Sequence, residues 1–176
     1  MKKCLMVLLL AAGAHAQSAG EVRKMLTAEA AKVRVLGSDP DIVAAVKAQN
    51  AKKVSLDTIR KLDQQWLAGK AEALVKQTTT SPCADRLRLL AAGAYREAFV
   101  MDERGAIVCA TARTSDYWQG DEAKFEQAYN GGKGNVFIDR PKYDDSASAA
   151  IAQISVPVMD NGKAIGAITV GLSITK

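Results

Sequence analysis

The sequence has 176 residues, of which 24 are lysine or arginine and 19 are aspartate or glutamate, so its net charge is +5. Charges are spread along the chain without a run of five or six of one sign. This pattern argues against a nucleic-acid-binding protein and against a polybasic membrane-binding segment. Length and composition are those of one globular domain with a sizeable core.

Residues 1–16 have the pattern of a cleaved signal peptide. Two lysines precede the apolar run Leu5–Ala12, and Ala14-His15-Ala16 has the small-x-small form that signal peptidase cuts. The run is shorter than the about 20 residues needed to span a bilayer. Cys4 lies before the run, whereas a lipoprotein cysteine follows it. We therefore expect a periplasmic or secreted protein that begins at Gln17, with an uncleaved N-terminal anchor as the alternative.

The expected cleavage also removes His15, the only histidine. The mature chain then has 160 residues and a net charge of +3. Without histidine it has neither a Ser-His-Asp nor a Cys-His mechanism, and it lacks the usual ligands of zinc. We expect no enzyme, no cofactor and no metal site.

Two cysteines remain after cleavage, Cys83 and Cys109. In an oxidising compartment an even pair favours a disulfide, which would close a loop of about 27 residues. The alternative is two separate buried thiols that pack as small apolar residues. Sequence spacing alone leaves both open.

The first half of the chain, residues 17–80, is predicted to be helical. Apolar residues recur at helical spacing from Val22 to Leu36. Asp39 before Pro40 is a typical helix start, and Ser55 is expected to cap a long helix. One apolar stripe, from Ile59 through Leu62 and Trp66 to Ala73, predicts that this helix packs on the core and that Trp66 is buried. A further short helix is expected to begin at Ser81-Pro82.

The second half, residues 81–176, changes to the period of strands. Residues 98–101 and 106–110 predict a hairpin, and residues 121–129 a helix. A short strand over 135–139 precedes two long strands, 149–159 and 163–174. Asp160-Asn161-Gly162 between them is a strong hairpin signal. The fold class is α+β: an antiparallel sheet of about five strands with long N-terminal helices packed against it, both halves forming one domain.

The residues that resemble a known family lie between about Tyr95 and Ile174. They are Val100-Met101-Asp102, Gly105, Thr114 to Glu122, Ser155-Val156-Pro157-Val158, and Gly162-Lys163-Ala164-Ile165-Gly166. In this order they resemble the Cache family of extracytoplasmic sensor domains, of the single-Cache type. The block Ser115 to Glu122 is the more specific part, because Asp-x-x-Gly turns occur in many PAS-like sheets.

The resemblance implies a PAS-like sheet with a ligand held between the sheet and its covering loops and helix. Many members of the family lie outside a chemoreceptor, histidine kinase or cyclic-dinucleotide enzyme. This sequence ends two residues after its last predicted strand, without an output domain. We therefore expect a stand-alone module whose signal passes to a membrane receptor or kinase.

Two loops that interrupt the sheet carry the candidate binding residues, because long loops on a rigid scaffold concentrate function. Arg113, Tyr117 and Trp118 lie on the first loop, where a guanidinium can hold a carboxylate between aromatic walls. The alternative is a structural role, in which both aromatic rings pack against the sheet and Arg113 makes a surface ion pair.

Tyr143 and Asp144 lie on the second loop. In the family, an aspartate just before the long hairpin often receives the ammonium of an amine ligand, so Asp144 or Asp145 is expected in this role. A turn in which the aspartate bonds its own backbone is the alternative. Arginine and aspartate together suit an amino-acid-like zwitterion, and arginine alone suits a simple carboxylate.

We therefore expect a periplasmic sensor module that binds a small organic anion or an amino acid. The alternative, from another class, is a non-catalytic interaction module on the same scaffold, which dimerises through its N-terminal helices or binds a receptor without a small-molecule ligand.

Overall fold

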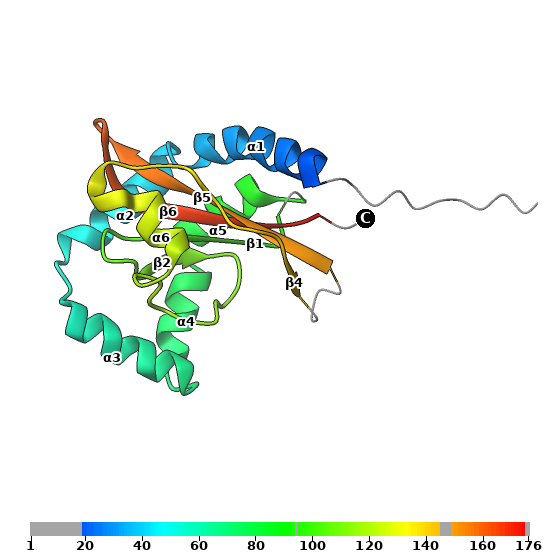
Figure 1. The fold of residues 1–176 in the computed structure, drawn as a ribbon. Helices are drawn as coiled ribbons and strands as arrows, with labels where there is room; N and C mark the ends of the chain where they lie inside the picture. Colours follow the sequence, from blue (N-terminus) through cyan, green and yellow to red (C-terminus); the bar gives the residue numbers. More distant parts are fainter. Residues whose placement is uncertain (1–18, 94, 145–148, 175–176) are drawn as a thin grey trace, which may run out of the picture.

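The computed structural model describes residues 19–93, 95–144 and 149–174 (Figure 1). The predicted signal peptide, its cleavage site and Asp145 lie outside the described residues. The helices are α1 (Ala19–Leu36), α2 (Pro40–Ala51), α3 (Leu56–Leu67), α4 (Glu72–Thr79), α5 (Pro82–Ala91), α6 (Ala123–Tyr129) and the 3-10 turn η1 (Asn130–Gly132). The strands are β1 (Glu97–Met101), β2 (Ile107–Ala110), β3 (Phe137–Ile138), β4 (Lys142–Asp144), β5 (Ala149–Asp160) and β6 (Lys163–Ser173).

The predicted helix starts are confirmed. The Asp39 carboxylate accepts hydrogen bonds from the backbone N–H groups of Asp41 and Ile42, two of the donors that the first turn of α2 leaves unpaired. The hydroxyl of Ser55 caps α3 in the same way, and that of Ser81 caps α5. Local side-chain chemistry therefore determines where these three helices begin.

The single long helix expected after Ser55 is wrong. The chain leaves the helix after Leu67 and starts a new one at Glu72. Gly69 has a φ of 70°, its N–H bonds the carbonyl of Trp66, and the N–H of Lys70 bonds the carbonyl of Gln65. These two bonds form a Schellman motif, in which glycine adopts the left-handed conformation at no steric cost. The apolar stripe therefore belongs to two helices.

The sheet is antiparallel, with strand order β2-β1-β6-β5-β3 and with β4 also paired to β5. Both predicted hairpins, β1–β2 and β5–β6, are confirmed. Asn161 and Gly162, with φ values of 48° and 80°, make the tight turn of the second one. The sheet has six strands rather than about five, because β4 lies within the segment expected to be a loop.

Helices cover both faces of this sheet (Figure 1). On one face, α1, α2 and α5 pack on alternate residues of the central strands, such as Val100, Ile154 and Ile168. On the other, α3, α6 and the loop after β2 pack on Phe99 and Met101. The α+β class with packed N-terminal helices is therefore confirmed, and Trp66 is fully buried as predicted.

Cys83 and Cys109 form a disulfide, with their Cα atoms 5.9 Å apart. The bond joins the first turn of α5 to the middle of β2, so it ties the helical layer to an outer strand of the sheet. The alternative of two separate thiols is excluded. In the part of the chain that the structure describes, no helix combines the length and the apolar character required to cross a membrane.

Candidate functional site

The loop between β2 and α6 carries three of the predicted binding residues, and α3 holds it in place. The guanidinium of Arg113 donates to the carbonyl oxygen of Trp66 at 2.6 Å and lies 5.6 Å from the centre of that ring. In return, the indole N–H of Trp66 donates to the carbonyl of Thr114 at 2.9 Å. Tyr117 is buried with its ring centre 5.7 Å from that of Trp66, and burial raises its pKa to about 12.

Asp63 of α3 fixes the next part of the loop. One carboxylate oxygen accepts the backbone N–H groups of Tyr117 and Trp118, at 2.8 and 3.0 Å. The indole N–H of Trp118 donates to the carbonyl of Arg104, and the guanidinium of Arg60 lies 5.0 Å from the centre of its ring. Arg113 and Trp118 line two different surface depressions, one beside α4 and the other beside α3.

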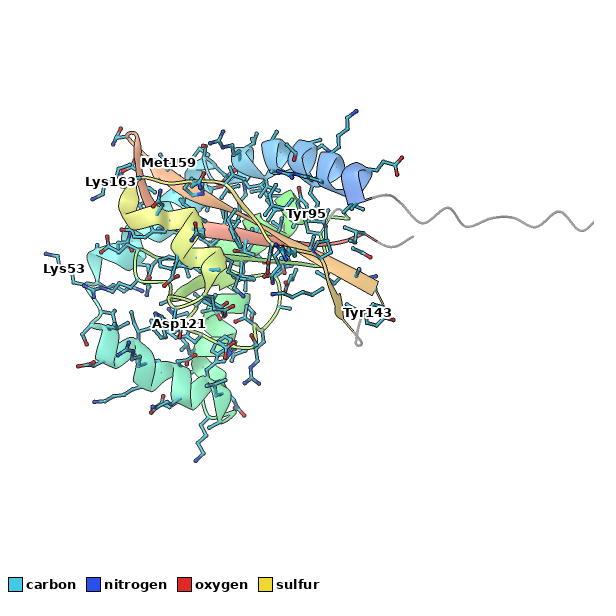
Figure 2. The ribbon with its side chains drawn as sticks, in the orientation of Figure 1. Lys53, Tyr95, Asp121, Tyr143, Met159 and Lys163 are labelled. Carbon is cyan, nitrogen blue, oxygen red and sulfur yellow. A yellow bond between two sulfur atoms is a disulfide. The ribbon has the colours of Figure 1, made fainter. Side chains whose placement is uncertain are left out.

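Tyr143 and Asp144 lie on β4, where they pair with Ala150 and Ala149. The side chain of Tyr143 is 67% exposed. Figure 2 shows it at the outer end of β4, well apart from Asp121, which follows the first loop. The structure thus brings Arg113, Tyr117 and Trp118 together around α3, with Tyr143 in a separate place. A ligand-binding role for these five residues stays a prediction.

The sheet face beneath α6 carries polar side chains that the sequence analysis did not select. One row crosses four strands: Phe99 on β1, Thr169 on β6, Ser155 on β5 and Phe137 on β3. The hydroxyls of Ser155 and Thr169 are fully buried and 2.7 Å apart. One hydroxyl donates to the other, so the pair has one hydroxyl hydrogen to offer to a further acceptor.

The neighbouring row consists of Glu97, Gly171 and Gln153. The side-chain amide of Gln153 donates to Glu97 Oε1 at 2.8 Å, across the glycine that separates them. A Cβ at Gly171 would lie 2.8 Å from this same oxygen, so the missing side chain makes the space for the carboxylate. Glu97 is half-buried and forms none of the ion pairs between the side chains that the structure describes.

Lys124, in the first turn of α6, turns inward over this face. Its side chain is 11% exposed, and its ammonium lies 2.9 Å from Glu122 and 5.3 Å from the centre of the Phe99 ring. Phe99 and Glu97 are two residues apart on β1 and point to the same face. A mostly buried ammonium and a carboxylate without a cation partner in the described part of the chain therefore share one face of the sheet.

Glu97, Lys124 and Gln153 are thus candidate site residues that sequence reasoning missed. Part of their signal was present: Gln153 and Ser155 are polar residues two positions apart in an apolar strand, and Glu97 is the charged residue of the apolar strand Glu97–Met101. No group of three metal-binding side chains occurs among the described residues.

No family model matches the sequence, and no curated protein matches it. Among solved structures, the ligand-binding domain of the Pseudomonas aeruginosa amino acid chemoreceptor PctC, in complex with GABA, is similar over 88% of this chain and 61% of that one, with 13% identity and a TM-score of 0.39. The sensory domain of the Campylobacter jejuni chemoreceptor Tlp3, with isoleucine bound, matches over 86% and 60%, with 12% identity and a TM-score of 0.40.

The sensor domain of the Vibrio cholerae histidine kinase DctB is similar over 87% of this chain and 57% of that one, with 10% identity and a TM-score of 0.38. The neighbours are Cache-type sensor domains, the family that the sequence resembles. The chain spans about three fifths of the length of these domains.

Proposed function

We propose that the protein is a sensor module that binds a small amino-acid-like ligand on the sheet face beneath α6. One observation carries the proposal: Glu97 and Lys124 present opposite charges on the same face, and hydrogen-bonding side chains lie on the neighbouring strands of the same two rows. A zwitterion needs this combination, because its carboxylate requires a cation and its ammonium requires an anion.

The spacing of the two charges supports a small ligand. Successive residues on one strand face are about 7 Å apart, and Lys124 lies over the residue that neighbours Glu97 on that face. The amide of Gln153 lies in the same row as Glu97, and the pair Ser155–Thr169 lies in the row of Phe99, which Lys124 covers. We infer that the ammonium group of the ligand pairs with Glu97 and that its carboxylate pairs with Lys124.

The first loop has a separate part in this proposal. Arg113, Tyr117 and Trp118 pack with Asp63 and Trp66 on the sheet side that binds the ligand. We propose that they hold the loop and α3 as one wall beside α6. Export to the periplasm and transfer of the signal to a membrane receptor or kinase complete the proposal.

Thermal shift followed by calorimetry on a panel of amino acids, matched carboxylates and matched amines tests this function, because a ligand that binds the folded state raises the melting temperature. Glu97→Gln should weaken binding of the amino acid roughly tenfold to a hundredfold and leave a simple carboxylate nearly unaffected. Lys124→Met should weaken both ligands.

Two exposed residues provide matched controls. Glu126→Gln on α6 and Lys133→Met after η1 remove the same charges away from the sheet face and should bind like the unchanged protein. A panel without any melting shift would contradict ligand binding. An amino acid that binds Glu97→Gln and Lys124→Met with unchanged affinity would move the site elsewhere, with the Arg113 loop as the next place to test.

A further inference from the structure

A cavity lies on the side of the sheet opposite the Glu97–Lys124 face, between the start of α1, the connection from β3 to β4, and the end of β6. Its volume is about 690 Å³, which is within the size range of small-molecule sites. The apolar residues that line it are Ala19, Val22, Leu26, Ile138, Pro141 and Ile174. None of them belongs to the Glu97–Lys124 face.

The wall of this cavity is apolar because α1 and β3 both contribute aliphatic side chains to it. Val22 and Leu26 are four residues apart on α1 and therefore lie on one face of that helix. Ile138 faces them from β3, and Ile174 follows the last residue of β6. Apolar surface of this kind gains free energy when a hydrocarbon displaces water from it, at roughly 25 cal/mol per Å².

The rim of the cavity is cationic. Arg23 on α1 and Arg140 after β3 line it, and both side chains are exposed. Neither guanidinium is in the ion pairs formed by the side chains that the structure describes. Asp139, the carboxylate that lines the same cavity, is already paired with Lys142 at 2.9 Å.

Ala19 and Val22, in the first described turn of α1, lie beside these guanidinium groups in the lining of the cavity. An apolar wall beneath two guanidinium groups is complementary to a molecule with a hydrocarbon tail and one anionic head. A carboxylate suits the planar guanidinium group, which can hold both of its oxygens.

We propose that this cavity binds a free, single-chain carboxylate amphiphile of medium length, such as a medium-chain fatty acid. The tail lies between Val22, Leu26 and Ile138, and the carboxylate is held by Arg23 and Arg140. This site is independent of the proposed amino-acid site, because it uses other residues on the opposite face of the sheet.

Calorimetry with three ligands of equal chain length tests the head group: decanoate, decanol and decyltrimethylammonium. We expect decanoate to bind at least about tenfold more tightly than decanol, and the cation to bind most weakly, since the rim is positive. The advantage of decanoate should shrink as salt is raised, because exposed charges are screened. Equal affinities for decanoate and decanol, or no binding of decanoate, would overturn the proposal.

Variants then locate the site. Arg23→Gln combined with Arg140→Gln should reduce the affinity for decanoate to that for decanol, and Val22→Trp should fill the cavity and weaken both. Arg34→Gln and Arg96→Gln remove exposed guanidinium groups away from the cavity and serve as controls. Unchanged decanoate binding in the double variant or in Val22→Trp would contradict the assignment, as would a dimer in sedimentation that buries Arg23 and Arg140.

Amino-acid binding separates this proposal from the previous one. Val22→Trp should leave the amino-acid affinity unchanged, and Glu97→Gln should leave the decanoate affinity unchanged. Failure of one site therefore leaves the other standing.

Discussion

The guanidinium of Arg113 lies against the ring of Trp66 and donates a hydrogen bond to the carbonyl oxygen of the same residue. Trp66 returns a bond to the loop through its indole N–H. The last turn of α3 and the loop after β2 are therefore locked by reciprocal contacts. This arrangement gives Arg113 a structural role that a ligand-binding role alone would not require.

We expect Arg113→Ala to lower the free energy of unfolding by about 1 kcal/mol, because it removes a charge-assisted hydrogen bond and a partly exposed cation–π contact. Denaturant unfolding measures the loss, with Lys61→Ala on the exposed face of α3 as the control. If Arg113 instead holds a ligand carboxylate, the same substitution should abolish carboxylate binding and leave stability unchanged. An unchanged denaturation midpoint would favour that earlier interpretation.

Removal of the disulfide, by Cys83→Ala with Cys109→Ala, should lower the free energy of unfolding by about 3 kcal/mol, since the unfolded chain is no longer constrained by a cross-link between residues 26 positions apart. Chemical denaturation of the oxidised and the double-variant protein gives the difference. Mass spectrometry without reductant checks the premise. Two alkylatable thiols in the unfolded, unreduced protein would contradict the bond.

Acid should weaken the contact between α5 and the start of α2. The hydrogen bonds and charge of Arg86 hold the pKa of the buried Asp39 carboxyl below its ordinary value of 3.8. The stabilisation is therefore fully present above about pH 4 and is lost as pH falls below 3.8 through the lower folded-state pKa. Between about pH 5 and about pH 3, on either side of the ordinary carboxyl pKa, the free energy of unfolding of Asp39→Asn should fall less than that of the unchanged protein. Denaturant unfolding followed by circular dichroism measures the difference.

Gly37 marks the point where the turn between α1 and α2 touches β5. Its carbonyl accepts the N–H of Met159, and a Cβ at this position would overlap the carbonyl oxygen of Pro157. Gly37→Ala should therefore cost about 2 kcal/mol or more, because backbone on both sides must shift. Ser38→Ala, one residue along and exposed, is the control. Equal melting temperatures for the two variants would contradict this close contact.

The features that sequence predicts well are local. Asp39, Ser55 and Ser81 start helices through bonds to their own first turn, and Asn161-Gly162 makes a turn through its own backbone angles. The break at Gly69 was missed because the apolar stripe continues past it. The direction that the chain takes after this break depends on how Trp66 packs against Tyr117, which is a contact between segments that are distant in sequence.

The candidate site depends on strand register, which no local pattern shows. Glu97 meets Gln153 because residue 97 pairs with Gly171 and Gly171 pairs with residue 153. Lys124 reaches this face because α6 packs against β5 and β6. The aromatic and charged residues of the two loops are adjacent in sequence and are therefore visible as candidate binding residues. The polar rows are assembled from three strands and a helix, so no short stretch of sequence shows them.

The strand order has a consequence for how the protein is made. β6, the last strand in sequence, lies between β1 and β5 at the centre of the sheet. Until it emerges from the ribosome, the β1–β2 hairpin and β5 have no common partner, and most of the buried surface has nothing to cover it. The domain therefore completes its core only after β6 has been synthesised, and a nascent chain that stops before residue 163 exposes both halves to aggregation or proteolysis.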